Sequence, residues 1–316
     1  MPIMKKWLLI VALTIGVCVN VHAQFDVHFT HYWKMLNFYN PAGAGAEEKM
    51  SIFAAYSNQL TGFEHNPKSM LLNIDAPIPF VGGDHNLGLG VLNDDIGLFS
   101  NQHLYLNYAY GFRMFKGRFA AGIQVGLVNS SFDSKDIILG GDSNDPAFPS
   151  GNVNGNTFDI GAGLLYQHRY FYVGIAGKHL NAPLILMGEK NEIQIDPNLN
   201  FTAGGNIPLK NTLISIQPSL QVMTDFVAWR ADITARGTYN YNDKVFFGGF
   251  TYSPTTSVAL FLGLEMMNIT ASYGYELFTS GISAKNGSHD IYIGYKIDLD
   301  IFKKEKNKHN SIRVLQ

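Results

Sequence analysis

The C-terminal region of the sequence constrains the fold most strongly. Residues 288–302 read SHDIYIGYKIDLDIF, in which apolar residues occupy every second position from Ile291 to Ile301. A β-strand sends alternate side chains to opposite faces, so this segment predicts a strand with one apolar and one largely charged side. Such a strand suits either a soluble sandwich or a closed barrel whose apolar side meets lipid and whose interior is wet.

The composition favours the barrel. Charged residues make up 15% of the chain, against about 25% in soluble domains, and aromatic residues reach 13%. Beyond the N-terminus there is no run of about 20 apolar residues, which a membrane-spanning helix needs. The net charge of -2 argues against a nucleic-acid partner. We therefore expect an all-β fold, a transmembrane antiparallel β-barrel of about 14 strands in the outer membrane.

The first residues are typical of a secretory signal peptide. Lys5 and Lys6 precede an apolar run over residues 7–21, and the small residue Ala23 follows it. We expect residues 1–23 to direct export and to be cleaved. Because Cys18 lies inside the apolar run, the mature chain would contain no cysteine.

Residues 24–48 form an aromatic segment without sustained alternation. Near its end stands the turn-rich run Asn40, Pro41, Ala42 and Gly43, which is poorly suited to a strand. We expect an N-terminal arm that plugs the barrel, with these four residues as the plug motif. An ordered lead-in packed across the barrel mouth is the alternative.

Residues 49–302 are predicted to form the barrel. Alternating segments bounded by turn residues are expected at 50–59, 68–78, 86–95, 102–115, 118–129, 157–168, 169–181, 199–208, 212–224, 227–239, 244–253, 257–267, 268–277 and 288–302. An even number of strands would place both chain ends in the periplasm. Small residues on the inner side, such as Gly122 and Gly126, are expected where a lumen is filled.

The longest connections are expected to be loops. Residues 133–157 are polar and rich in turn residues, which predicts an extracellular loop, and residues 184–198 are predicted to form another. Asp142, Asn144 and Asp145 could suggest calcium ligands, but the full spacing with a later Glu is absent, so a solvated loop is the expectation.

Two further features concern the membrane boundary. Tyr166, Tyr170 and Tyr172 are expected in an aromatic girdle where the barrel wall meets the lipid headgroups. Residues 303–316 are basic and polar, and are predicted to form a periplasmic tail.

A set of charged residues falls on the inner side of the predicted strands. Its members are Asp75, Arg113, Asp159, Arg230, Asp232, Arg236, Glu265, Glu276, Lys296 and Asp298. Both signs occur, so the side chains can pair across the lumen and offset the cost of burying isolated charges. We interpret the set as a structural network in a plugged barrel, with a selectivity path as the alternative.

The sequence lacks familiar catalytic patterns. It contains no nucleophile elbow, HExxH or phosphate-binding loop, and the scattered His103, His168, His179 and His289 suit interface or lumen positions. We expect no enzyme activity, no catalytic residues, no metal site and no cofactor.

Several short motifs occur in a consistent order along the chain. They are FTHY at 29–32, NPAGAG at 40–45, LTG at 60–62, DAP at 75–77, GLG at 88–90 with Asn93, Asp94 and Gly97, YAY at 108–110, DPAF at 145–148, YGY at 273–275, TSG at 279–281 and GSH at 287–289. Each motif is short, but the ordered set resembles the PorP/SprF family of type IX secretion membrane proteins over nearly the whole mature chain.

The resemblance implies an integral outer-membrane component of the type IX secretion and gliding machinery. It implies three classes of partner: periplasmic ring lipoproteins, a peptidoglycan-binding lipoprotein, and secreted or surface-attached cargo with C-terminal sorting domains. Residues 40–43 also resemble the plug motif of long-chain fatty-acid transporter barrels, so a plugged transporter for small hydrophobic solutes is the alternative function. A purely structural anchor between outer membrane and cell wall is a third.

Overall fold

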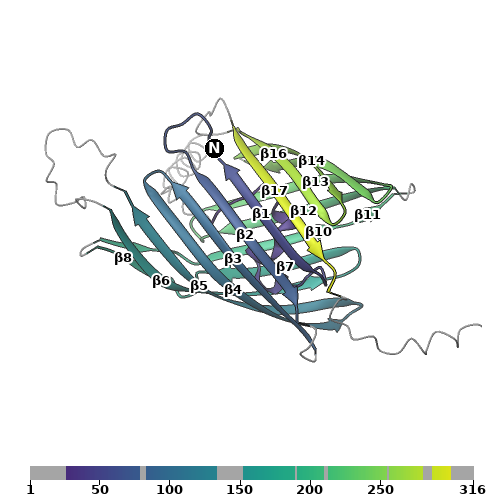
Figure 1. Ribbon diagram of the computed structural model, residues 1–316, viewed down its shortest axis with the longest axis horizontal. Coiled ribbons are helices and arrows are strands. Elements are labelled where there is room, and N and C mark those ends of the chain that lie inside the picture. The colour runs from purple at the N-terminus through teal and green to yellow at the C-terminus, as the bar shows by residue number, and fades with distance from the viewer. Residues whose placement is uncertain are drawn as a thin grey trace, which may run out of the picture.

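The alternation predicted from the sequence becomes a closed antiparallel barrel of 14 strands in the computed structural model (Figure 1). The structure describes residues 26–78, 83–133, 152–188, 191–209, 213–254, 256–279 and 287–299. The expected signal peptide, the tail at 303–316 and the calcium candidates Asp142, Asn144 and Asp145 lie outside the described residues.

Each of the fourteen predicted segments overlaps one barrel strand. The strands are β1 (Met50–Asn58), β2 (Lys68–Pro77), β3 (Asp84–Ile96), β4 (Phe99–Met114), β5 (Gly117–Phe132), β6 (Val153–Gln167), β7 (Phe171–Lys178), β10 (Asn198–Gly205), β12 (Ile214–Thr224), β13 (Trp229–Tyr241), β14 (Lys244–Ser253), β15 (Ser257–Met266), β16 (Ile269–Phe278) and β17 (Ser288–Ile297). The short β11 (Ile207–Pro208) follows β10 and also pairs with β12. Pairing of β10 with β12 and of β1 with β17 closes the ring, so the barrel has no free sheet edge between neighbouring strands.

The wall separates an apolar outer face from a polar inner face. On β4, the exposed Leu104 and Leu106 alternate with the buried Tyr105 and Asn107. The last strand, β17, shows the same pattern, since Ile293 is 54% exposed while Asp290 is 3% exposed. A closed ring satisfies the backbone hydrogen bonds of its strands internally, which lipid requires. Within the described residues, no helix has the length and hydrophobicity needed to cross a membrane.

The two ends of the barrel differ in their connections. At one end, here called the turn end, two-residue turns join β4 to β5, β13 to β14 and β15 to β16. Both residues of each turn have positive φ, as in Asn242 (48°) and Asp243 (59°). This is the type I′ conformation, whose twist matches that of the paired strands. The opposite end, here called the loop end, carries the longer connections at 59–67 and 179–197.

The segment at 184–198 contains a hairpin, so the prediction of a plain loop was wrong. Strands β8 (Leu184–Met187) and β9 (Asn191–Gln194) pair as a separate two-stranded sheet. Ile185 and Met187 are buried against the inward-facing Val128 of β5. Residues 184–187 read LILM, and because all four are apolar the alternation that marks a strand was not visible.

The expected aromatic girdle is only partly present. Tyr170 is 46% exposed in the turn before β7. Tyr172 instead points into the barrel, where its ring packs beside Ala42 and its hydroxyl is buried. Alternate side chains of β7, which begins at Phe171, point to opposite faces, and that of Tyr172 points inward. Gly204 on β10 leaves room for the Tyr172 ring on the inner side.

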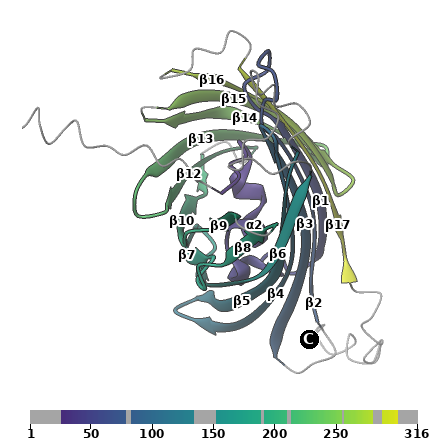
Figure 2. The ribbon, with the colours of Figure 1, turned by 90° about the vertical axis from the view of Figure 1, so that its left-hand side faces the viewer.

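The N-terminal arm lies inside the ring of strands rather than across its mouth. Residues 26–48, here called the arm, contain η1 (Tyr32–Lys34), α2 (Leu36–Tyr39) and η2 (Pro41–Gly43). Viewed along the barrel, α2 lies within the ring (Figure 2). The predicted arm inside a barrel is therefore confirmed as an element of the fold.

Candidate functional site: the arm in the barrel lumen

The arm runs through the lumen from the loop end to the turn end. Near its start, Asp26 binds Lys178, the last residue of β7, with 2.8 Å between the charged atoms. Near its end, Glu47 binds Lys296 of β17 at 2.7 Å. The arm then continues into β1 at Met50, so it is fixed at both ends of the barrel.

Asn40 begins the last helical turn of the arm and joins it to the wall. Its side chain accepts a hydrogen bond from the backbone N–H of Ala42 at 2.9 Å, and Pro41 follows at the first helical position. Asn as N-cap and Pro at the first position are both favoured at helix starts. The Asn40 amide also donates to the carbonyl oxygens of Leu164 on β6, at 3.0 Å, and Ile175 on β7, at 3.3 Å.

The wall facing this turn is made of glycine. A Cβ added at Gly122 of β5 would lie 2.3 Å from the backbone nitrogen of Ala42, and one at Gly163 of β6 would lie 2.1 Å from Asn40 Oδ1. Gly43 is equally restricted, because its own Cβ would lie 2.6 Å from the backbone of Leu36. The four residues of the predicted plug motif thus pack together against a wall that only small residues permit.

The middle of the arm forms a shared hydrophobic core with the barrel. The arm contributes Phe29, Tyr32, Trp33, Met35, Phe38 and Tyr39, all buried. The Trp33 ring lies 4.7 Å from that of Phe261 on β15. Burial of each large side chain contributes roughly 1.5–3 kcal/mol, so apolar contact is the main force that holds the arm in place.

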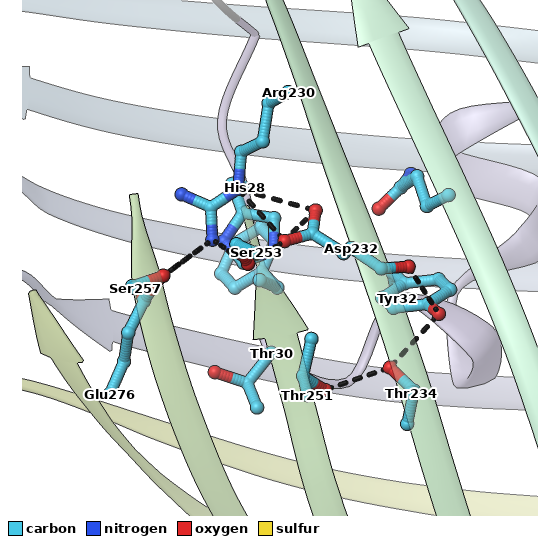
Figure 3. A network of polar contacts seen from close by, with 12 residues as sticks. His28, Thr30, Tyr32, Arg230, Asp232, Thr234, Thr251, Ser253, Ser257 and Glu276 are labelled. Atoms are coloured by element: carbon cyan, nitrogen blue, oxygen red, sulfur yellow. Dashed lines mark hydrogen bonds and ion pairs between the residues drawn. The ribbon is translucent and has the colours of Figure 1, made fainter. Parts of the chain in front are cut away.

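A buried ion network lies beside the first residues of the arm (Figure 3). The Arg230 guanidinium binds the carboxylates of Asp232 at 3.0 Å and Glu276 at 2.7 Å. From the arm, His28 Nε2 lies 3.2 Å from Asp232 Oδ2, and the Ser253 hydroxyl donates to the other oxygen of Asp232. Three residues of the predicted lumen set therefore form one network that includes the arm.

Further hydrogen bonds extend the contacts on this side. The backbone N–H of Thr30 donates to the Asp290 carboxylate at 2.6 Å. The Tyr32 hydroxyl lies 3.0 Å from the hydroxyls of Ser219 and Thr234. Figure 3 shows the contact between Tyr32 and Thr234. Together these bonds join the arm to β12, β13 and β17.

A second network anchors the start of the arm at the loop end. Asp26 contacts Lys178 and His179, and His179 Nδ1 lies 2.9 Å from Asp159 Oδ1. Burial alone would raise the pKa of Asp26, but Lys178 and His179 hold it well below its ordinary value. Burial alone would lower the pKa of His179, but Asp26 and Asp159 raise it to about 9. His103 completes the network at 3.2 Å from Asp159.

A third network lies near the turn end. Lys34 of the arm binds Glu265 at 3.1 Å. Lys296 bridges Glu47 of the arm, at 2.7 Å, and Glu265, at 3.8 Å.

Two further predicted residues contact the arm individually. The Asp75 carboxylate accepts a hydrogen bond from the backbone N–H of Gly45 at 2.9 Å. The Arg236 guanidinium lies over the Trp33 ring, 4.8 Å from its centroid, and donates from Nε to Gln217 at 2.9 Å. Both residues therefore touch the arm without an opposite charge from it.

The remaining two predicted residues lie at the turn end, away from these networks. Arg113 is exposed at the end of β4. Asp298 follows β17 and binds Lys49 at 2.9 Å, with its side chain 58% exposed. The structure thus brings the other eight residues of the set into contact with the arm or with its partners.

Sequence reasoning missed the partners that the arm itself supplies. Asp26, His28 and Lys34 each face a wall charge, and each lies in a segment where no strand period marks an inner side. A ladder of buried amides was also missed, in which the Asn37 amide donates to Asn73 and accepts from Asn107 at 2.8 Å. The signal for the wall members was present, because both asparagines lie on the inner parity of β2 and β4.

Most charges of this arrangement are paired with one another, whereas Asp75 and Arg236 have uncharged partners. Among the described residues, no three His, Cys, Asp or Glu side chains are grouped as a metal site. The arm is bonded to several parts of the wall, from β2 on one side to β13 on the other.

Solved structures similar to this chain are outer-membrane barrels. The CymD monoaromatic hydrocarbon channel has 14% sequence identity and a TM-score of 0.51, over 88% of this chain and 95% of CymD. The Pseudomonas putida toluene transporter TodX has 10% identity and a TM-score of 0.46, over 86% of this chain and 94% of TodX. At such identities, the likeness to CymD shows a shared fold, and the likeness to TodX is weaker still.

The search of curated proteins found no match to this chain. A family model described as "Type IX secretion system membrane protein PorP/SprF" matches residues 21–295. Neither this family nor CymD is described as an enzyme. The family and the barrel fold place the protein in the outer membrane, in association with the secretion machinery. The chain belongs to the PorP/SprF family of type IX secretion system membrane proteins.

Proposed function

We propose that this protein is a plugged docking component of the type IX machinery, and that it does not act as an open pore. Its turn end would meet periplasmic ring lipoproteins and a peptidoglycan-binding lipoprotein. Its loop end would meet secreted or surface-attached cargo with C-terminal sorting domains. The lumen charges, in this proposal, serve to hold the arm rather than to select a solute.

The observation that carries the proposal is the attachment of the arm to the wall by buried polar groups. Opening a path past the arm would separate His28 of the arm from Asp232 of the wall, which is fully buried. Removing one partner of a buried ion pair costs about 3–5 kcal/mol. Several such contacts would have to break together, which favours a permanently closed barrel.

The surface at the turn end supports docking there. A hollow of about 830 Å³ lies beside the end of the arm, with Glu48 and the β4–β5 hairpin in its lining. Arg118 binds Asp84 at 2.5 Å, whereas Arg113 and Lys116 are exposed. A concave surface that carries exposed charges suits a protein partner with complementary charge.

The first test is deletion of the gene, followed by proteomics of the cell surface and the medium. We expect specific loss of proteins that carry C-terminal sorting domains, and recovery when the wild-type gene is returned. An unchanged set of exported proteins would contradict the proposal and favour the plugged transporter for small hydrophobic solutes, for which solute uptake is the next assay.

A second test separates docking from transport. The double variant Arg113→Glu, Lys116→Glu changes the turn end, whereas deletion of residues 24–48 removes the arm. The proposal expects the turn-end variant to lose crosslinks to periplasmic lipoproteins while the barrel stays folded. Solute permeation through the variant without the arm, together with intact secretion, would instead support a transporter.

A further inference from the structure

A cavity of about 350 Å³ lies at the loop end, between the inner wall and the β8–β9 hairpin. Its walls are largely apolar, with Leu92, Ile96 and Phe99 from the barrel side and Ile185, Ile193 and Ile195 from the hairpin side. Size and lining of this kind are typical of small-molecule sites, in which a few polar groups fix the orientation of the ligand.

Asn198, the first residue of β10, supplies such a polar group. The residue lines the cavity and is only 4% exposed. Both amide atoms, Nδ2 and Oδ1, lack a hydrogen-bond partner among the described residues. A buried amide without partners destabilises the fold, so a partner for Asn198 is to be expected in the cavity.

Several other polar groups of the lining are already bound. Asp94 accepts a hydrogen bond from the Ser69 hydroxyl at 2.6 Å, and Asn101 accepts one from Ser130 at 2.7 Å. Asp26 and His179 bind each other at 3.1 Å and each has a further charged partner. No Lys or Arg among the described residues lines the cavity, so an anionic ligand would gain no free counter-charge on entering. A cationic ammonium group can only donate, and it would leave the Asn198 Nδ2 donor without a partner.

We propose that this cavity binds a small, uncharged and mainly apolar molecule whose polar group both donates to and accepts from the Asn198 amide. A primary carboxamide has this pattern, because its oxygen can accept from Nδ2 while its nitrogen donates to Oδ1. A carboxylate can only accept and would lie close to the carboxyl group of Asp94. This inference is independent of the proposed role in secretion.

The probe for the test is radiolabelled octanamide, with the protein in lipid nanodiscs and empty nanodiscs as the background. We expect saturable binding, with competition by unlabelled octanamide and at least about tenfold weaker competition by octanoate. Asn198→Leu keeps nearly the same side-chain shape and removes the unpartnered amide. It should weaken octanamide binding about tenfold, which corresponds to loss of one or two hydrogen bonds.

A second pair of variants tests the cavity itself. Ile193→Trp places a large ring in the cavity and should abolish binding. Leu186→Trp is the matched control, because Leu186 lies in the same hairpin and is 58% exposed. Thermal unfolding checks that all variants fold, and we expect Asn198→Leu to unfold at the same or a higher temperature.

Three results would each overturn the inference. They are absence of saturable octanamide binding to the wild-type protein, equal binding by the wild type and Asn198→Leu, and equal competition by octanoate and octanamide. Loss of cargo secretion in the gene deletion bears on the docking role alone, so the two proposals can fail separately.

Discussion

Two regions of the arm, one at its start and one close to its end, are held in different ways. The charged end, residues 26–30, depends on ion pairs and hydrogen bonds to β7, β13 and β17. The fitted end, residues 40–45, depends on close backbone contact with glycines of β5 and β6, together with the cap and wall bonds of Asn40. One end is therefore held mainly by electrostatics and the other mainly by shape.

This difference predicts how each end responds to a change. Charge pairs weaken when pH changes the protonation of a partner, whereas steric fit does not depend on pH. Conversely, one added methyl group disrupts a close-packed contact but leaves a distant ion pair intact. Substitutions at the two ends should thus give separable effects on stability.

The largest expected effect is on the charged end. Asp232→Ala would leave Arg230 and His28 without their shared carboxylate, and we expect a loss of about 3–5 kcal/mol in the free energy of unfolding. Urea unfolding of the refolded barrel in lipid vesicles measures it. Trp33 fluorescence reports on the arm once the exposed Trp229 is replaced by Phe. A loss below about 1 kcal/mol, as for an exposed pair, would show that this network does not hold the arm.

The next effect is a pH dependence that only the charged end should show. The pKa of His179 rises to about 9 in the folded protein. Protonated His179 therefore stabilises the fold fully below its unfolded pKa of about 6.5, and this stabilisation is lost as pH rises from there to about 9. The change amounts to about 3 kcal/mol. Urea unfolding at pH 6.5 and at pH 9 should reveal it in the wild type.

The control for this prediction is His179→Gln, which cannot be protonated in that range. Its stability should vary less between the two pH values than that of the wild type. Equal pH dependence in both proteins would assign the effect to another group. Asp26 acts in the opposite direction, because its pKa is lowered in the folded protein. It adds stability at pH values above its ordinary pKa, and this stability is lost as the pH falls.

A smaller effect is expected at the fitted end. Gly122→Ala introduces a Cβ 2.3 Å from the backbone of Ala42, and we expect a loss of about 1–3 kcal/mol from overpacking. Gly237→Ala is the matched control, since the nearest atom to its added Cβ is 3.9 Å away. The Gly122 loss should be the same at pH 6.5 and at pH 9. If both alanine variants were equally stable, close packing would not be what holds this end.

The sequence allowed the barrel to be predicted more fully than the contents of its lumen. Period-two alternation marks the barrel strands locally, so the opposite facing of Leu104 and Tyr105 could be inferred without any tertiary information. The plug motif was also visible, because the turn-rich residues 40–43 do not suit a strand. These features depend on neighbours in the sequence.

The rest depends on contacts between distant residues. His28 meets Asp232 only because the arm lies in the lumen, and nothing near His28 in the sequence indicates a partner. Asn198 looks like an ordinary strand-end residue until the β8–β9 hairpin folds over it to form the cavity. Local pattern therefore predicts the wall, whereas the interior is decided by the path of the arm.

The smallest pair of effects tests whether burial, rather than charge alone, determines how much a contact contributes to the free energy of unfolding. Asp75→Ala removes the buried acceptor of the Gly45 N–H, and we expect a loss of about 1–3 kcal/mol with no loss of a chemical activity. Asp298→Ala removes a salt bridge whose acidic side chain is 58% exposed, and should cost less than about 1 kcal/mol. Urea unfolding at pH 7 compares the two. Equal losses would mean that the contact with the arm adds nothing beyond the charge. If the wild type turned over a substrate and Asp75→Ala did not, the role of Asp75 would be catalytic in place of structural.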